Sequence, residues 1–178
     1  MTIGGYDTND FVGNLTWFDV SATESWNLTG SVLAVADVMN LNPNATDFEI
    51  EVQAGYPYIG LPTFSFTSLT ELMSETLNPD NTANFYCNDN GQYGGRSQCY
   101  WKSTYCSNVI TNDYALDLTI GDNTFSIPIK NLLGDSMVNS RHDCDLYVGQ
   151  LYNLFENSIR IGDPFISAFL PVFDVENN

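Results

Sequence analysis

The sequence has few basic side chains. Lys and Arg together number 5 and there is a single His, against 22 Asp and Glu, which gives a net charge of −17. A surface this negative repels the phosphates of nucleic acids and of anionic lipid headgroups. The composition therefore predicts neither nucleic-acid binding nor attachment to a membrane surface.

Long apolar runs, linkers and repeats are also missing from the sequence. The longest apolar candidates, such as Phe165–Phe173, fall short of the ~20 residues that a membrane helix needs. Met1–Asp7 has neither the basic nor the apolar region of a signal peptide. With 178 residues, 43% hydrophobic and 13% aromatic, the chain is instead predicted to be one globular domain rather than a disordered segment.

Four cysteines and one histidine are the candidate zinc ligands of the sequence. Cys87, Cys99, Cys106, Cys144 and His142 do not form the closely spaced pairs of a zinc site. Disulfides are the favoured interpretation, and spacing alone leaves three connectivities open. Disulfides indicate an oxidising compartment and hence export. Because Met1–Asp7 carries no export signal, we expect the chain to be part of a longer precursor.

Three sequons permit N-glycosylation, at Asn14, Asn27 and Asn44. The pattern is short, and the sequence is rich in Asn, Ser and Thr, so matches by chance are expected. The sequons therefore permit glycosylation without arguing for it.

Alternating or apolar runs separated by turn residues predict strands. These runs are Asn14–Val20, Ser31–Met39, Phe48–Val52, Tyr114–Ile120, Thr124–Ile129 and Phe169–Val175. Gly121–Asn123 is a turn signal between two of them, which predicts a hairpin. One face of its first strand is predicted to carry Tyr114, Leu116, Leu118 and Ile120, and its second strand to point Phe125, Ile127 and Ile129 inward.

Helical signals are fewer and short. Thr67–Leu77 is predicted to be a helix capped by Thr67 or Ser68, with Leu69, Leu72 and Met73 along one stripe. Asp163–Phe169 predicts a short helix with Pro164 in its first turn, and Ile129–Leu133 predicts a single turn. Many strands with few helices predict a mainly-β sandwich or barrel-like domain.

Several segments resemble one protein family. Thr2–Asp7 (TIGGYD) with Val12–Trp17, Leu118–Pro128, Ile161–Phe165 (IGDPF) and Val172–Asn177 are similar, in order and spacing, to the C-terminal lobe of pepsin-like aspartic proteases. The resemblance extends over essentially the whole chain, 1–178. It implies a mainly-β lobe of packed antiparallel sheets with a few short helices, and an N-terminal lobe that is not in this chain.

The resemblance also implies a disulfide pairing and a location. Cys106 and Cys144 flank the predicted hairpin as the bridge of that lobe does, which leaves Cys87 to pair with Cys99. Such proteins belong outside the cell, at its surface or in an acidic secretory or vacuolar compartment. The sequence stops at Asn178, before the last short strand expected of the lobe, which is a further reason to expect a longer protein.

The catalytic segment of the family would correspond to Ile50–Pro62, which is followed by the predicted helix. The family motif at the end of this strand is Asp-Thr-Gly-Thr or Asp-Ser-Gly-Ser. In this chain Gln53 takes the place of the aspartate, Ala54 that of the hydroxyl residue, and Tyr56-Pro57 that of the next small residues. The resemblance therefore places five residues in the cleft: Gln53, Ala54, Gly55, Tyr56 and Pro57.

A glutamine at this position removes the expected chemistry. Aspartic proteases share one proton between two carboxylates, and an amide does not titrate at any working pH. Glu51 precedes Gln53 on the same strand face but lies about 7 Å away, too far to share that proton. We therefore assign no catalytic residue, and we expect bulky Tyr56, Pro57 and Tyr58 to fill or re-line the former substrate site.

The remaining polar candidates have plainer interpretations. Asp89–Gly91 is expected to be an Asx turn, and Asp163 is expected to be a structural residue of the Gly-Asp turn. Asp143 and Asp145, with the loop at 88–90, offer calcium ligands, but a solvated turn is favoured because no Glu closes an EF-hand spacing. The aromatic side chains near the cysteines are expected to pack or to make surface contacts; they are Tyr93, Tyr100, Trp101 and Tyr105.

Three functions compete on these observations. The first is a catalytically inactive pepsin-like lobe that serves as a binding or structural module. The second is half of an active aspartic endopeptidase whose other lobe lies upstream or in another chain. The third is an assembly subunit of an extracellular structure. The expected partners are an N-terminal lobe and a protein or peptide, and no cofactor or metal is implied.

Overall fold

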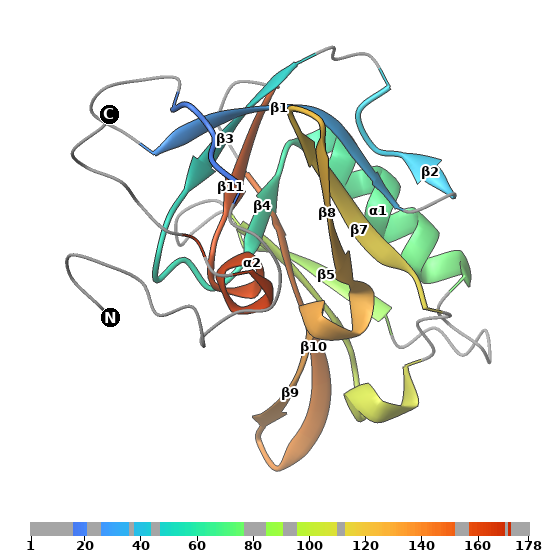
Figure 1. Cartoon of the computed structure of the whole chain (residues 1–178). Helices are drawn as coiled ribbons and strands as arrows, with labels where there is room; N and C mark the ends of the chain where they lie inside the picture. Colours follow the sequence, from blue (N-terminus) through green and yellow to red (C-terminus); the bar gives the residue numbers. More distant parts are fainter. Residues whose placement is uncertain are drawn as a thin grey trace.

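The computed structural model of the protein describes residues 16–20, 26–35, 38–43, 47–76, 85–90, 96–109, 113–151, 157–169 and 171. These residues form one large mixed sheet, two α-helices and two short 3-10 helices (Figure 1). The mainly-β prediction is therefore confirmed. None of the described helices is long and apolar enough to cross a membrane.

The sheet contains 11 strands. From one edge to the other it runs β5 (Phe85–Asn90), β6 (Arg96–Trp101), β10 (Arg141–Gln150), β4 (Ile59–Leu61), β11 (Ser158–Ile161), β3 (Phe48–Val52), β1 (Asn27–Val35), β7 (Ala115–Ile120) and β8 (Asn123–Pro128). Two further strands lie off this path, β2 (Met39–Asn40) beside β1 and β9 (Leu133–Val138) beside β10. Two pairings, β3 with β11 and β4 with β10, are parallel, which the expectation of purely antiparallel sheets did not include.

The predicted hairpin is present as β7 and β8. Leu116 faces Ile127 across the pair, and Leu116, Leu118 and Ile120 are buried in the core. The chain turns at Gly121, whose φ of +56° is a conformation that favours glycine. The single turn predicted after the hairpin is the 3-10 helix η2 (Ile129–Leu132).

The first helix begins earlier than predicted. Helix α1 (Thr63–Thr76) starts at Thr63, so the predicted caps at Thr67 and Ser68 are wrong. Its first turn is stabilised by tertiary contacts, because Phe66 is buried and the Ser65 hydroxyl donates to the carbonyl of Leu41 at 2.7 Å. Farther along, Leu69 and Met73 are buried against the sheet as the stripe predicted.

The second helix follows the prediction more closely. Helix α2 (Asp163–Ala168) has Pro164 in its first turn and lies in front of the central strands in Figure 1.

Two strand predictions need correction. Residues 16–20 are not in a strand, and the run Ser31–Met39 is divided between β1 and β2. Most of the predicted strand Phe169–Val175 lies outside the described residues.

Two disulfides join the predicted pairs, Cys87 with Cys99 and Cys106 with Cys144. The first crosslinks the edge strands β5 and β6. The second ties the 3-10 helix η1 (Cys106–Asn108) to β10. Of the sequons, Asn14 and Asn44 lie outside the described residues, while the side-chain amide of Asn27 donates to the Glu49 carboxylate on the neighbouring strand β3.

Candidate functional site

The position predicted for a catalytic residue is a tight turn that follows β3. Strand β11 lies between β3 and β4, parallel to the first and antiparallel to the second, so the turn crosses the end of β11. The backbone N–H of Gln53 donates to the carbonyl of Ile161 at 3.0 Å, and that of Tyr56 donates to the carbonyl of Gln53 at 3.2 Å. Gln53 is thus held where the strand ends and the turn begins.

The turn and the start of α2 are locked together by reciprocal hydrogen bonds. The N–H of Gly55 donates to Oδ1 of Asp163 at 2.9 Å, and the N–H of Asp163 donates to the carbonyl of Tyr56 at 2.7 Å. Gly55 has a φ of +79°, which explains the glycine. Gly162 is required for a different reason, since a Cβ there would lie 1.9 Å from the carbonyl oxygen of Tyr56.

The turn presents small and amide side chains to solvent. Gln53, Ala54, Gly55 and Pro57 are exposed, whereas Tyr56 is only 3% exposed. The expectation that the bulk of Tyr56 fills the site is therefore wrong for its side chain. Its ring is buried, with the guanidinium of Arg160 over it at 5.4 Å from the ring centroid.

The acids beside the turn are engaged by neighbouring groups. Glu51 accepts from Arg160 through Nε at 2.8 Å and Nη2 at 2.7 Å, and Asp163 accepts from Gly55 as described above. The side chain exposed at the strand end is the amide of Gln53, which donates and accepts hydrogen bonds but exchanges no proton. This amide can take part in hydrogen bonds, whereas acid–base hydrolysis by proton sharing needs a carboxylate.

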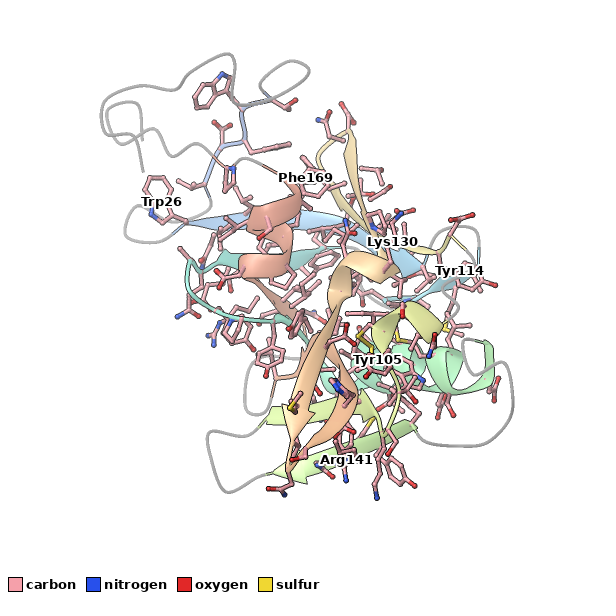
Figure 2. The ribbon with its side chains drawn as sticks, turned by 90° about the horizontal axis from the view of Figure 1, so that it is seen from below. Trp26, Tyr105, Tyr114, Lys130, Arg141 and Phe169 are labelled. Atoms are coloured by element: carbon pink, nitrogen blue, oxygen red, sulfur yellow. A yellow bond between two sulfur atoms is a disulfide. The ribbon has the colours of Figure 1, made fainter. Side chains whose placement is uncertain are left out.

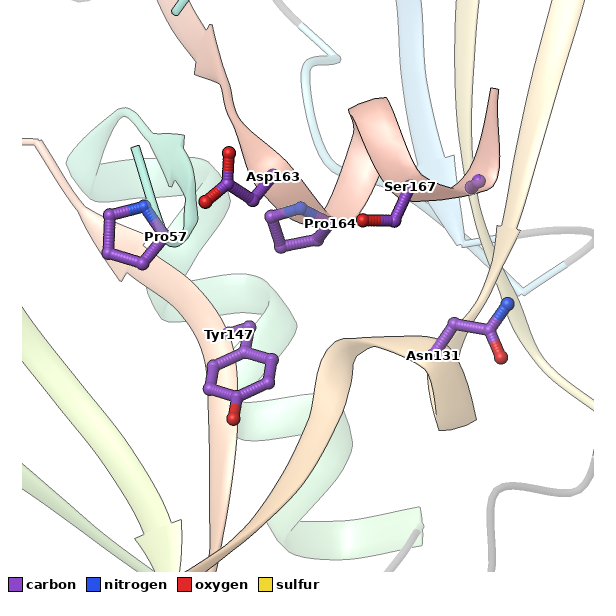
Figure 3. Close-up of a pocket in the computed structure, with 7 residues that line it drawn as sticks. Pro57, Asn131, Tyr147, Asp163, Pro164 and Ser167 are labelled. Atoms are coloured by element: carbon purple, nitrogen blue, oxygen red, sulfur yellow. The ribbon is translucent and has the colours of Figure 1, made fainter. Parts of the chain in front are cut away.

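A pocket of about 500 Å³ lies next to the turn. Pro57 lines it from the turn, Asn131 from η2, Tyr147 from β10, and Asp163, Pro164 and Ser167 from α2 (Figure 3). Of these residues, the sequence indicated Pro57 as a cleft residue, Asp163 as part of a turn and Pro164 as part of the first helical turn. Asn131, Tyr147 and Ser167 carry no motif, and only the folding of distant segments brings them together.

A second polar cluster lies on the β9–β10 hairpin, which projects from the body of the domain (Figure 1). Asp143 is 2% exposed and accepts from Nε and Nη2 of Arg141, both at 2.7 Å, and from the N–H of Ser103 at 2.8 Å. The hydrogen bonds from Arg141 hold the pKa of Asp143 below its ordinary value. Burial, with the nearby charge of Asp143, raises the pKa of Asp145.

These contacts correct the expectation of a solvated turn at this cluster. Asp143 is a buried, ion-paired residue, and its carboxylate oxygens accept hydrogen bonds from Arg141 and from the N–H of Ser103. No group of three or more metal-ligating side chains occurs among the described residues. The histidine of the hairpin, His142, stacks on Tyr105 with ring centroids 4.4 Å apart. Figure 2 shows Tyr105 and Arg141 on one side of the molecule, away from Trp26 and Phe169.

The aromatic residues near the cysteines divide between the core and the surface. Trp101 is buried and packs on Phe85, with ring centroids 4.6 Å apart. Tyr100 stacks on Tyr86 across the β5–β6 pair, and Tyr105 is exposed. Tyr93, the fourth residue of that set, lies outside the described residues.

A family model described as eukaryotic aspartyl protease matches residues 1–178. A search among curated proteins gives no significant match. The matched residues are the same ones over which the resemblance of separate segments extends.

Proposed function

The chain belongs to the eukaryotic aspartyl protease family, and we propose that it forms a C-terminal lobe of that fold in which Gln53 occupies the position of a catalytic aspartate. The proposal is that this lobe binds a protein or peptide and does not hydrolyse it. Its partners would include an N-terminal lobe, supplied by the same precursor or by another chain. The two disulfides are compatible with an oxidising compartment, outside the cell or in its acidic vesicles.

The observation that carries this proposal is the exposed amide of Gln53 at the end of β3. The turn around it keeps the features of a constrained site, with Gly55 in a left-handed conformation and two hydrogen bonds to Asp163. An amide in that position can hydrogen-bond an acid of a partner lobe, but it cannot take and return the proton that peptide hydrolysis needs. Ala54 supplies no hydroxyl to brace such an acid.

The competing function with the most direct test is an active endopeptidase. The experiment measures cleavage of an unstructured protein at pH 3–5 by the natural protein together with any lobe that it carries or recruits. We expect no turnover and no binding of pepstatin. Pepstatin-sensitive turnover that Gln53→Ala abolishes would show that Gln53 is part of a working site and would overturn the proposal.

A matched pair of variants tests the chemical reasoning. Gln53→Asp combined with Ala54→Thr restores the carboxylate and the hydroxyl, whereas Gln53→Asn with Ala54→Thr restores only the hydroxyl. With an N-terminal lobe that retains its own aspartate, we expect acid-pH turnover from the first variant alone. Turnover from the Asn variant would contradict the requirement for a second carboxylate.

A further inference from the structure

The pocket beside the turn combines rigid apolar walls with one carboxylate. Figure 3 shows the rings of Pro57 and Tyr147 on one side and the Asn131 amide on the other, with Pro164 and Ser167 between them. Proline rings have few conformations, so two of these walls are rigid before any ligand arrives. The pocket therefore offers a preformed apolar surface with polar groups at its margins.

The third wall, Tyr147, is also held in place. Its ring packs edge-on against Tyr58, with ring centroids 6.2 Å apart. It lies over the backbone of Gly134, where an added Cβ would be 2.0 Å from the tyrosine hydroxyl. Any side chain at position 134 would displace the ring. Glycine at position 134 thus allows Tyr147 to occupy its place in the pocket wall.

The charge of the pocket is negative. Among the described residues that line it, Asp163 alone is charged, and its Oδ1 is oriented by the N–H of Gly55. Asn131 and Ser167 add uncharged hydrogen-bonding groups. The net charge of −17 reinforces the attraction of a cation, while Lys130, exposed next to Asn131, opposes it.

We propose that this pocket binds an arginine side chain of a partner protein or peptide. The apolar stem of arginine fits between Pro57 and Pro164, and its planar guanidinium can stack on Tyr147 while it donates to the Asp163 carboxylate. Lysine would bind more weakly, because a compact ammonium neither stacks nor forms paired hydrogen bonds. The inference deepens the proposed binding function and rests on it.

The first test uses small probes whose binding is followed by NMR of the full 178-residue protein. N-acetyl-arginine amide is titrated against N-acetyl-citrulline amide, which has nearly the same shape without the charge, and against N-acetyl-lysine amide. We expect saturable shifts at the Asn131 side-chain amide and the Ser167 backbone amide with the arginine probe at millimolar concentration. Equal binding of the citrulline probe, or no binding of the arginine probe, would overturn the proposal.

Variants locate the binding. Asp163→Asn keeps an oxygen to accept from Gly55 but removes the charge, and we expect about fivefold weaker binding of the arginine probe, as for a partly exposed ion pair. Asp122→Asn removes the same charge at the β7–β8 turn, outside the pocket lining, and should leave binding unchanged. Ala168→Phe fills the pocket without touching the turn and should abolish binding.

The outcomes separate this inference from the proposed function. If Asp122→Asn weakened binding of the arginine probe as much as Asp163→Asn does, overall charge would explain the effect, and the proposal that the pocket binds arginine would be overturned. Binding of the arginine probe by the Ala168→Phe variant would also overturn the proposal, and this test does not depend on whether Asp163→Asn folds. Neither result restores peptide hydrolysis, which the acid-pH assay of the Gln53 variants measures separately.

Discussion

Replacing Gly162 by alanine tests the packing that holds the candidate site together. Gly162 links β11 to α2 at the point where the turn after β3 crosses the strand end. A Cβ at this position would lie 1.9 Å from the carbonyl oxygen of Tyr56 and 2.8 Å from that of Tyr58. Both oxygens belong to the backbone, so neither can rotate away as a flexible side chain would.

The expected cost follows from what must move. Overpacking a rigid site costs about 1–3 kcal/mol. If the turn withdraws from α2, the hydrogen bond from Asp163 to Tyr56 at 2.7 Å and that from Gly55 to Asp163 at 2.9 Å are lost. Each is worth about 1 kcal/mol net. We therefore expect Gly162→Ala to lower the free energy of unfolding by about 3–5 kcal/mol.

The assay is urea unfolding with the disulfides intact, followed by the fluorescence of the tryptophans and by circular dichroism. The matched control is Gly121→Ala, where φ is +56° but the nearest atom to a new Cβ lies 4.0 Å away. That variant incurs only the left-handed backbone cost of about 1–2 kcal/mol. A loss in Gly162→Ala no larger than that in Gly121→Ala would refute the steric argument.

Four further predictions concern charge and crosslinks. Asp143→Asn should lower the free energy of unfolding at pH 7 by about 1–3 kcal/mol, because Arg141 loses its buried partner. The pKa of Asp143 is depressed, so this stability is present above the ordinary value of 3.8 and disappears as the pH falls through the folded pKa; the difference between variant and parent should therefore shrink as the pH is lowered below 3.8. Burial raises the pKa of Asp145, so its ionised form destabilises the fold at neutral pH, and Asp145→Asn should raise the melting temperature at pH 7 but not at pH 3. Replacing Cys106 and Cys144 by alanine should lower the free energy of unfolding by about 4 kcal/mol, because the bridge closes a loop with a sequence separation of 38 residues. Urea unfolding measures this difference. For the parent protein, a net charge of −17 predicts a higher melting temperature at pH 5 than at pH 8, and the reverse order would contradict the dominance of self-repulsion.

Features encoded by neighbouring residues were predictable from the sequence. The β7–β8 hairpin follows from alternation around Gly121, since side chains two apart on a strand face the same way. A strand that ends beside Gln53, a turn with a glycine at 55 and a helix after Pro62 were also predicted, and they are present as β3, the turn and α1. The correspondence of Gln53 to a catalytic aspartate stays a prediction. These signals depend on spacing along the chain, and distant contacts do not alter them.

Tertiary structure decided what those residues contact. Helix α1 begins at Thr63 because Phe66 and Ser65 find partners in the folded core, which no local propensity expresses. Tyr56 is buried, and its ring contacts Arg160, which the parallel pairing of β11 with β3 brings beside the turn.

The pocket is the clearest example of a feature that local sequence patterns do not predict. Its walls come from the turn after β3, from η2, from β10 and from α2, and the bond between Gly55 and Asp163 joins residues 108 positions apart. Periodicity and turn signals extend over only a few residues. Contacts between distant segments form only when the strands pair and bury the core. The sequence alone therefore predicted that a strand ends beside Gln53, while packing determined the pocket beside it.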